Sequence, residues 1–363
     1  MRCKFPYLVA VRSAFFRVAN GLQAWCPTVR LTAMNTTTEQ VLARLRGSSD
    51  FVSGQALSAE LGLTRAAIWK AVHQLLDLGY DVEAVSRRGY RLRQVGEGAI
   101  ASELEPLLTT RLLGRERCCL AETGSTNTVA KERAGQGAPH GLLVTADRQT
   151  QGRGRMQRPW HSPAGRNLYA SLLLRPVVAP PRVPQLAIVV ALALGEALAE
   201  CVPDIPVRIK WPNDLWIGTR KVCGILCEME AEMTAVHYVV VGVGLNVNLT
   251  EDEIPAELRE VATSLRVAGG REVSRVALLA AFLNRLEPLL DRWTEAEDLT
   301  PFLAAYDRLA LLHNRQIRVE QPRGVLTGWA VGINPQGELL VETPEGMVRV
   351  HSGDAHIQRD SLV

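Results

Sequence analysis

The sequence predicts an α+β protein in three parts: a winged helix-turn-helix, a central domain with a mixed sheet, and a small C-terminal β-barrel. Apolar residues near the N-terminus recur at helical spacing on both sides of the tight turn Gly62-Leu63-Thr64. From about Cys118, β-like runs alternate with helical segments. Beyond about His313 short strands and glycine turns follow, and the 363 residues suffice for each part to bury its own core.

Three short helices are expected first. Thr36 and Glu39 have the spacing of a capping box for the first helix, while Ser53 and Thr64 are expected to cap the second and the third. Each helix is expected to end at a glycine, namely Gly47, Gly62 and Gly79. Two strands, residues 81–85 and 90–93, then form a hairpin.

The outward face of the third helix and the hairpin carry side chains suited to phosphates and base edges. They are Arg65, Ala66, Trp69, Lys70, His73 and Gln74 on the helix, and Arg87, Arg88, Arg91 and Arg93 on the hairpin. A net charge of +3 is too small for nucleic-acid binding over the whole surface, so a DNA site must be a local patch. The plainer alternative is a helical domain with a solvated charged face, but the helix-turn-helix and the basic hairpin together favour DNA binding.

The central part is expected to hold a long sheet with helices on one side. Its strands are Cys118–Ala121, Leu142–Ala146, Leu168–Leu174, Val207–Trp211, Val222–Met229 and Val236–Val243, and its helices are Thr126–Ala134, Val183–Glu200 and Arg275–Trp293. The strands of the barrel are Ile317–Glu320, Val325–Ile333, Glu338–Val341 and Met347–Val350. The uncharged stretch Val183–Gly195 is shorter than a membrane span and is interpreted as a buried helix, so no membrane partner is expected.

These patterns divide the chain into residues 35–95, 96–312 and 313–363, with a linker at residues 96–101. Residues 1–34 are interpreted as a non-native or disordered extension, because they contain basic but no acidic side chains and a domain begins just after Met34. A transit peptide has a similar composition, and an upstream start codon is the preferred explanation. The seven cysteines contain no Cys-x-x-Cys pair, which indicates reduced thiols in the cytoplasm rather than a disulfide framework or a zinc site.

The most informative segment is the loop from Gln149 to Trp160. Gly152 and Gly154 allow the backbone to approach a ligand closely, and three arginines between and after them supply positive charge. Such a loop suits a phosphate or a carboxylate. It has neither the G-x-G-x-x-G spacing nor a Walker lysine, and the alternative is a disordered basic loop.

Two further segments place polar residues at strand ends. In Arg208-Ile-Lys-Trp-Pro-Asn-Asp-Leu215 a lysine and a carboxylate flank a turn, and Lys221 follows on the next strand. Gly224 on that strand is expected to leave space for a ligand. The apolar run Val241-Gly-Val-Gly-Leu-Asn-Val-Asn248 ends in two asparagines. By itself each segment is also compatible with an ordinary strand and turn.

Together with Gly124-Ser-Thr-Asn127 and Arg220-Lys-Val-Cys-Gly-Ile-Leu, these segments occur in one order that resembles the biotin–protein ligases. The segment Leu61-Gly-Leu-Thr-Arg-Ala-Ala-Ile-Trp-Lys70 resembles the bifunctional bacterial form, which is also the biotin operon repressor. The resemblance covers roughly residues 37 to 358. It implies a class II synthetase-like catalytic domain and an SH3-like C-terminal domain.

The resemblance also implies a reaction and its partners. ATP would adenylate biotin in the presence of Mg²⁺, and the product biotinyl-5′-AMP would pass biotin to a lysine of the biotin carboxyl carrier protein of acetyl-CoA carboxylase. With biotinyl-AMP bound, a homodimer would bind operator DNA of the biotin biosynthesis genes and repress them.

The ligand-binding residues implied by the match to the family motifs are Ser125, Thr126, Asn127, Gln149, Arg153, Gly154, Arg155, Trp160, Asn213, Lys221 and Asn246. The residues implied to act in catalysis are Arg155, Lys221, Lys210 and Asp214. The family loop usually has glycine where Gln157 stands, so Gln157 would be strained if that position needs a positive φ.

Three alternatives stay open at this point. Lipoate and octanoate transferases share the catalytic fold, although the helix-turn-helix and the Gly-Arg-Gly-Arg loop argue for biotin. The chain could instead be a biotin-sensing repressor with weak ligase activity. Conversely, it could be a ligase whose N-terminal domain no longer recognises an operator.

Overall fold

A computed structural model of the chain describes residues 35–48, 50–77, 80–95, 103–321 and 324–358. The N-terminal extension, the helix end at Gly79, the linker at residues 96–101 and two of the cysteines, Cys3 and Cys26, lie outside the described residues. The five cysteines within them are all free thiols.

The N-terminal part contains three helices and a hairpin. These are α1 (Thr36–Arg46), α2 (Gly54–Leu61), α3 (Arg65–Asp77), β1 (Tyr80–Val85) and β2 (Gly89–Val95), with the two strands antiparallel. The expected caps are confirmed for two helices, since Ser53 accepts the N–H of Ala56 and Thr64 accepts that of Ala67.

The capping box expected at Thr36 is wrong by one residue. Asn35 has the extended backbone of an N-cap, and its side-chain oxygen accepts the N–H of Thr38 at 2.9 Å. Asparagine caps at least as well as threonine, so the helix begins one position earlier than the box predicts. Gly62 ends α2 in the left-handed conformation, as expected.

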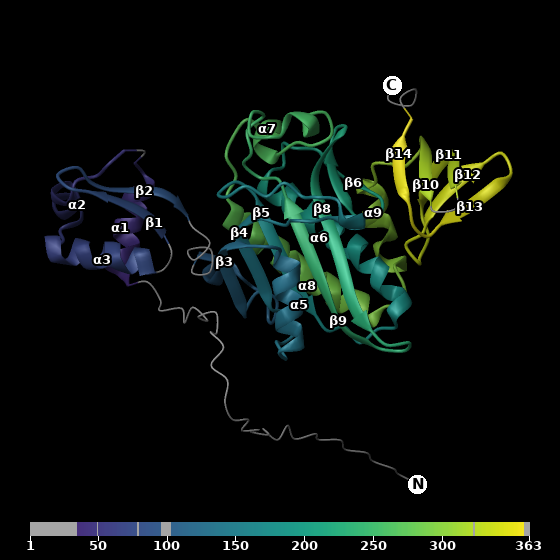
Figure 1. Cartoon of the computed structure of the whole chain (residues 1–363), viewed down its shortest axis with the longest axis horizontal. Helices are drawn as coiled ribbons and strands as arrows, with labels where there is room; N and C mark the ends of the chain where they lie inside the picture. Colours follow the sequence, from purple (N-terminus) through teal and green to yellow (C-terminus); the bar gives the residue numbers. More distant parts are fainter. Residues whose placement is uncertain (1–34, 49, 78–79, 96–102, 322–323, 359–363) are drawn as a thin grey trace, which may run out of the picture.

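The central part is a seven-stranded mixed sheet in the order β3-β4-β5-β9-β8-β7-β6 (Figure 1). Its strands are β3 (Arg117–Thr123), β4 (Leu143–Gln149), β5 (Leu168–Leu174), β6 (Val207–Lys210), β7 (Asp214–Ile217), β8 (Arg220–Ala231) and β9 (Val236–Leu245). The pair β3 and β4 is parallel, and every other neighbouring pair is antiparallel. The four-residue β7 was not expected. It follows directly after a turn and is too short to show a pattern of its own in the sequence.

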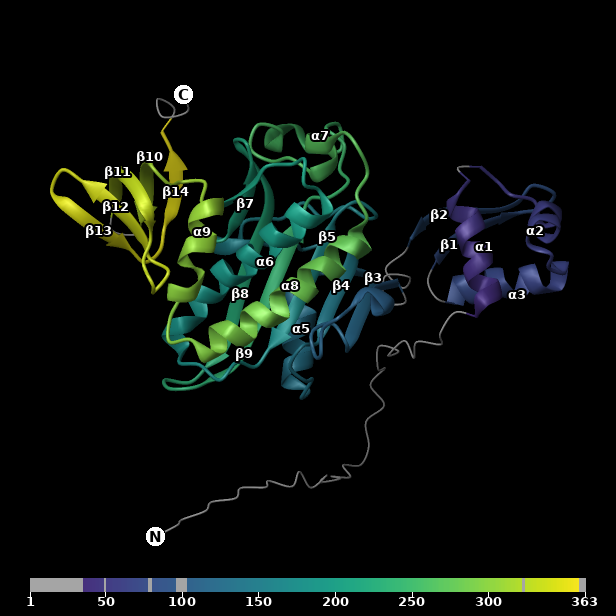
Figure 2. The ribbon, with the colours of Figure 1, turned by 180° about the vertical axis from the view of Figure 1, so that it is seen from behind.

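Helices α6 (Leu186–Cys201) and α8 (Arg275–Glu295) cover one face of the sheet (Figure 2). The expectation that all helices lie on one side is wrong, because α5 (Thr126–Gly135) packs on the other face. Leu172 and Leu174 of β5 join the core under α6 and α8, whereas Leu173 contacts the cluster that contains Ala130 of α5. Alternate residues of a strand point to opposite faces, so β5 is buried on both.

The segment Pro180–Cys201, which includes α6, is long and apolar enough to cross a membrane by length and composition. It is one such helix among the described residues, and 72% of its most apolar window is buried inside the protein. The buried core helix of a globular protein can also be this long and apolar. Because most of this window is buried inside the protein, α6 is a core helix, as expected.

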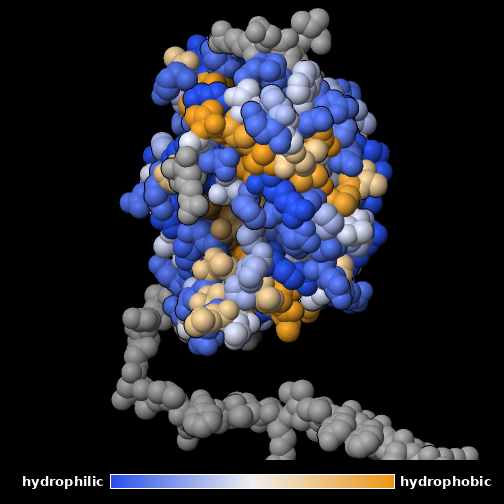
Figure 3. Space-filling model, turned by 90° about the vertical axis from the view of Figure 1, so that its right-hand side faces the viewer, coloured by the Kyte–Doolittle hydropathy of each residue, from blue (hydrophilic) through white to orange (hydrophobic). Residues whose placement is uncertain are grey.

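The C-terminal part is an antiparallel sheet in the order β13-β12-β11-β10-β14. It follows the short helices α7 (Leu265–Gly269) and α9 (Leu303–Leu309) and consists of β10 (Arg315–Gln321), β11 (Gly324–Ile333), β12 (Leu339–Thr343), β13 (Gly346–Val350) and β14 (Asp354–Ile357). Its inward residues, such as Val319 and Val341, belong to the same core cluster as α6 and α8. The side of the molecule at this end is mainly hydrophilic with scattered apolar patches (Figure 3).

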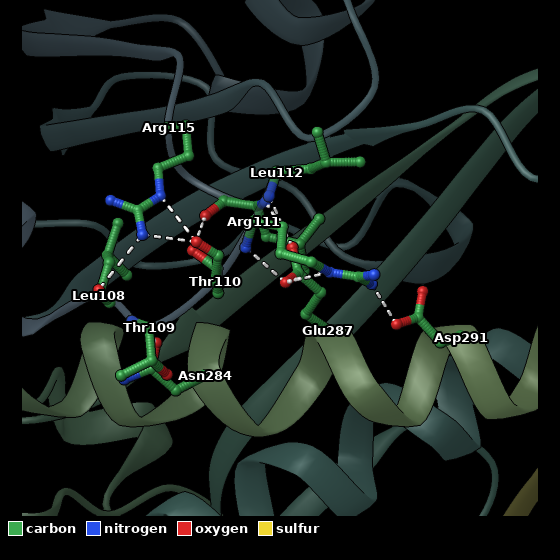
Figure 4. Close-up of polar contacts among 10 residues, drawn as sticks. Leu108, Thr109, Thr110, Arg111, Leu112, Arg115, Asn284, Glu287 and Asp291 are labelled. Carbon is green, nitrogen blue, oxygen red and sulfur yellow. Dashed lines mark hydrogen bonds and ion pairs between the residues drawn. The ribbon is translucent and has the colours of Figure 1, made fainter.

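The segment that enters β3 is tied to α8 through its backbone (Figure 4). Glu287 of α8 accepts the N–H groups of Arg111, Leu112 and Leu113 at 2.6, 2.8 and 2.9 Å. Asn284, one turn earlier, accepts the N–H of Thr109 at 2.8 Å. Within the described residues, five short 3-10 helices complete the fold: Glu105–Leu107, Arg155–Gln157, Pro180–Gln185, Ala256–Leu258 and Thr300–Phe302.

Candidate functional site

A cleft of about 710 Å³ lies over the sheet beside the N-terminus of α5. The glycine–arginine loop forms one wall, and β7, β8 and β9 contribute the residues of the sheet. The C-terminal sheet closes another side with Glu320, Gln321 and residues 352–354.

The structure brings most of the predicted ligand residues to this cleft. Those that line it are Ser125, Thr126, Asn127, Gln149, Arg153, Gly154, Arg155, Trp160, Asn213, Asp214 and Lys221. Lys210 and Asn246 are buried and are not among the residues that line it. Segments more than 90 residues apart in the chain therefore meet at one site.

The wall next to α5 is polar but uncharged. Thr126 begins α5, and Gln149 at the end of β4 accepts its backbone N–H at 2.9 Å. Asn127 and Thr126 both contact the hydroxyl of Ser171, which rises from the sheet beneath them. All of these side chains except Gln149 are less than 10% exposed, so their positions are fixed by the fold.

Glycines of the sheet make room for this wall and for Trp160. A Cβ atom on Gly242 would lie 2.3 Å from Asn127 Oδ1, and one on Gly244 would lie 2.6 Å from Trp160 Nε1. Gly224, which was expected to leave space for a ligand, lines the cleft, and a Cβ atom on it would lie 3.1 Å from Lys221 Nζ and 3.2 Å from the ring of Trp160. The glycine pattern thus seats the aromatic ring on the sheet.

The glycine–arginine loop crosses the cleft as a short 3-10 turn. Arg155 donates to Asn213 Oδ1 at 3.1 Å, and Arg153 donates to Thr128 at 3.3 Å. Met156 and Gln157 have φ values of 54° and 58°. The position of Gln157 therefore does have the positive φ that was expected to strain it. Met156 beside it is also in the left-handed conformation.

A lysine and an aspartate meet below the loop. Lys221 Nζ lies 2.7 Å from Asp214 Oδ1 and 5.3 Å from the centre of the Trp160 ring. Cation and carboxylate neutralise each other, and the ring is positioned for a cation–π contact. The indole N–H of Trp160 and Nε of Arg153 are buried, and neither has a hydrogen-bond partner within the described part of the chain.

Lys210 lies 4.4 Å from the centre of the Trp216 ring and is 6% exposed. Burial lowers the pKa of its ammonium, while nearby Asp214 and Asp354 act in the opposite sense. The amide of Asn246 is taken up by protein, since it donates to the carbonyl of Thr263 and accepts from Asn167. These two residues support the cleft from beneath in this structure.

The motifs missed two carboxylates that contact predicted site residues or the arginine loop. Glu228 on β8 accepts from Asn127 at 2.8 Å and pairs with Lys131. Asp354 at the start of β14 pairs with Arg158 of the loop at 2.8 Å. Neither lies in a recognisable motif, because the first is one acidic residue in a long strand and the second belongs to the distant C-terminal sheet.

The pKa of Asp354 is lowered. Burial acts to raise it, but the hydrogen bond from Arg158 and the positive charge of Lys210 outweigh that effect. Asp354 is thus an anion that ties the C-terminal sheet to the arginine loop.

The face predicted to bind DNA is exposed. On α3 the exposed residues are Arg65, Ala66, Trp69, Lys70 and His73, and in the hairpin they are Arg87 and Arg88. A groove of about 450 Å³ separates the start of α3 from the hairpin and is lined by Arg65 and Arg87. Within the described residues neither arginine has an ion-pair partner.

Three residues assigned to that face have other contacts. Gln74 turns toward α1 and accepts from Thr38 at 2.6 Å and from Asn35 at 2.8 Å. Arg91 pairs with Glu83 at 2.7 Å, so it contributes less positive charge than expected. Arg88 is exposed but lies over the Phe51 ring at 4.3 Å. The side chain of Arg93 lies outside the described part.

Comparisons with known proteins agree across the chain. A helix-turn-helix domain profile matches residues 37–91, the biotin/lipoate A/B protein ligase family matches residues 120–246, and the biotin protein ligase C-terminal domain matches residues 312–356.

The bifunctional ligase/repressor BirA of Bacillus spizizenii is 38% identical over 89% of this chain and 100% of its own length. The corresponding protein of Escherichia coli strain K12 is 32% identical over 88% of this chain and 96% of its own. A solved structure of biotin protein ligase from Aquifex aeolicus in complex with biotin and ATP is similar with a TM-score of 0.58 and 31% identity, covering 68% of this chain and 99% of that one. The chain therefore belongs to the family of bifunctional biotin–protein ligases and biotin repressors.

Proposed function

We propose that the protein adenylates biotin with ATP, transfers biotin to a lysine of a carrier protein, and represses transcription through its winged helix. One observation carries the enzymatic part of the proposal. Arg155 and Lys221 come from different elements and line one cleft whose opposite wall, at Thr126 and Asn127, is polar and uncharged. Such a cleft suits a neutral polar ring at one end and an anion at the other.

The reaction needs cations more than it needs a nucleophile from the protein. In the first step a carboxylate oxygen of biotin bonds to the α-phosphorus of ATP, and the bond to pyrophosphate breaks. In the second step the neutral amine of the carrier lysine bonds to the acyl carbon, AMP leaves and the amine loses a proton. Two anions must meet in the first step, so fixed positive charge and positioning supply the catalysis.

The roles that we propose follow from the positions described above. Ser125, Thr126, Asn127 and Gln149 bind the ureido ring of biotin. Arg153, Gly154 and Arg155 close over its carboxylate and the phosphate, and Lys221 neutralises the anions with Arg155. These assignments agree with the residue types, because guanidinium groups recognise phosphate and carboxylate in a bidentate manner.

The remaining residues would act on the nucleotide. Trp160 offers its ring and an unused indole N–H to the adenylate, with Asn213 and Asp214 at the strand end beside it. Lys210 and Asn246 remain among the residues that we propose for the nucleotide site. Lys210 would contribute positive charge, and Asn246 would hold the end of its strand in place. The donor set thus includes aromatic, cationic and amide groups.

Mg²⁺ enters this proposal as part of the ATP substrate. Among the described residues no group of three or more His, Cys, Asp or Glu side chains could hold a metal ion. Asp214 is paired with Lys221 and Asp354 with Arg158. Mg²⁺ commonly keeps several waters and binds to substrate phosphates, so a dedicated protein site is not required.

For the partners we propose the biotin carboxyl carrier protein of acetyl-CoA carboxylase and the operator of the biotin biosynthesis genes. A homodimer formed with biotinyl-AMP would match two operator half-sites. Both partners place the protein in the cytoplasm, with which the free thiols agree. We propose the division at residues 35–95, 96–312 and 313–363.

A transfer assay tests the enzymatic proposal. Protein, magnesium-ATP, biotin and an apo carrier domain are mixed, and the carrier is blotted with streptavidin. We expect labelling that requires ATP and the carrier lysine. A parallel reaction with labelled lipoate distinguishes the related transferases, and transfer of lipoate alone would refute the assignment. Operator binding is measured by electrophoretic shift with and without biotin and ATP.

A further inference from the structure

A buried series of hydrogen bonds runs behind the polar wall of the cleft and ends on Glu228. Asn127 is 3% exposed, and its amide nitrogen donates to Glu228 Oε2 at 2.8 Å. Its amide oxygen lies 2.6 Å from the hydroxyl of Ser171, which lies 2.7 Å from the hydroxyl of Thr126. Thr126 Oγ1 in turn lies 3.2 Å from Gln149 Oε1. We call these five residues the polar relay.

An ionised Glu228 determines which group donates and which accepts in each hydrogen bond of the polar relay. A carboxylate only accepts, so Asn127 must present its amide nitrogen to Glu228 and its oxygen to Ser171. Ser171 has one hydroxyl proton, and Asn127 Oδ1 takes it. The proton between Ser171 and Thr126 must then come from Thr126. Gln149 Oε1 therefore receives the backbone N–H of Thr126 but not its hydroxyl proton, and both side-chain oxygens keep lone pairs at the cleft.

The surroundings of Glu228 keep it ionised. Lys131 of α5 donates to Oε1, and Arg153 Nη2 lies 4.0 Å from the same oxygen. Burial acts to raise the pKa of Glu228, but the hydrogen bonds of Lys131 and Asn127 and the two positive charges outweigh that effect and lower it. The carboxylate therefore stays an acceptor at neutral pH.

We propose that Glu228 is a positioning residue that makes Thr126 and Gln149 hydrogen-bond acceptors, so that this wall selects a ligand presenting N–H groups. The inference rests on the proposed function, in which that ligand is the cyclic urea of biotin. Glu228 does not line the cleft, and it acts on the ligand through Asn127.

A glutamine at position 228 should reverse the relay. It has one oxygen, which Lys131 attracts, and its amide nitrogen then faces Asn127. Asn127 must turn its oxygen toward position 228 and its nitrogen toward Ser171. Ser171 then donates its proton to Thr126, whose own proton points at Gln149 Oε1 or at the ligand, so that in either case the wall offers fewer acceptors to the ligand. Replacing Lys131 by methionine in addition lets the glutamine oxygen return to Asn127 and restores the original direction.

The experiment compares Glu228→Gln, Lys131→Met and the double variant in the full chain, with Glu122→Gln as a control that removes a surface carboxylate paired with Arg148. Biotin binding is measured by calorimetry, KM and kcat by the transfer assay, and the melting temperature by circular dichroism. Glu228→Gln should raise Kd and KM for biotin about 10- to 100-fold, with kcat at saturating biotin within about threefold. The double variant should return to within about threefold of Lys131→Met.

An unchanged KM in Glu228→Gln overturns the inference. The inference is also overturned if the double variant keeps the raised KM for biotin of Glu228→Gln. A KM that Lys131→Met does not restore would mean that Glu228→Gln only damages the structure of the wall. If the unaltered protein neither binds nor transfers biotin, the proposed function fails and this inference fails with it.

Discussion

Replacing Glu287 tests whether one carboxylate holds the segment that precedes β3. Three backbone N–H groups point at it, and that of Leu113 belongs to a residue with no exposed surface. Removing the acceptor leaves this N–H unsatisfied, at a cost of about 1.5–3 kcal/mol for a bond to a charged group. The N–H groups of Arg111 and Leu112 are only partly buried and can reach water, so each adds about 0.5–1 kcal/mol. Glu287→Ala should therefore lower the free energy of unfolding by about 2.5–5 kcal/mol.

Two further variants separate this effect from the loss of charge. Glu287→Gln keeps an oxygen for Leu112 and Leu113 but turns an amide nitrogen toward Arg111, so its loss should be about 1–2 kcal/mol. Asp291→Asn removes the exposed ion pair with Arg111 and should change stability by less than about 0.5 kcal/mol. Urea denaturation followed by circular dichroism measures all three. Equal stability of Glu287→Ala and Asp291→Asn would refute the reasoning.

The same carboxylate makes stability depend on pH. Burial acts to raise the pKa of Glu287, but the three backbone donors outweigh it, so the folded-state pKa lies below the unfolded value. Its contribution is then complete above the unfolded pKa of about 4.3 and is lost as pH falls through the folded pKa. The melting temperatures of the unaltered protein and Glu287→Gln should accordingly converge in acid, and a constant difference down to that range would contradict the assignment.

Three other predictions concern the cleft and the DNA face. Gln157→Gly should relieve about 1–2 kcal/mol of left-handed strain and slow the dissociation of biotinyl-AMP, which a stopped-flow chase measures; an unchanged rate would mean that the strain persists with ligand bound. Gly244→Ala places a methyl group 2.6 Å from Trp160 Nε1 and should raise KM for ATP more than KM for biotin, and equal changes would argue against a nucleotide role for that ring. Arg87→Ala should lower the salt dependence of DNA binding by about one phosphate contact, while Arg88→Ala, which removes a guanidinium that lies over the Phe51 ring, is the matched comparison; an unchanged slope for Arg87→Ala would remove it from the interface.

The elements with strong local signals were predictable. The strand β5 was expected at the residues where it occurs, because a run of seven residues that are apolar except for Ser171, between polar ones, indicates a buried strand. The caps at Ser53 and Thr64 follow from local chemistry as well. Asn35 was missed because two adjacent residues could both cap α1, and the sequence does not say which one adopts the extended backbone.

The candidate site was predictable where its residues are clustered in a motif. Arg155 and Lys221 stand in segments whose order carries the family resemblance, and both line the cleft. Asp354 also lines the cleft, but it was not predictable, because its contact with Arg158 joins positions 196 residues apart and depends on how the C-terminal sheet packs. Gln74 was predicted to belong to the DNA-binding face but does not point there. Its position on α3 suits a residue that faces the DNA groove, yet a side chain there can also reach an adjacent helix, and here it is hydrogen-bonded to Thr38.

The two walls of the cleft are built in different ways. We expect one wall to determine which ligand binds and the other to determine how long the adenylate stays bound. The wall at Asn127 is buried, held by hydrogen bonds among its own side chains and braced by Gly242, where no side chain fits, so it is rigid before a ligand arrives. The opposite wall is a loop with two non-glycine residues in the left-handed conformation, and Met156 at its turn is 81% exposed. Because the strain of Gln157 acts only on the loop, a substitution there should change how long the adenylate is held and leave the choice of biotin to the rigid wall.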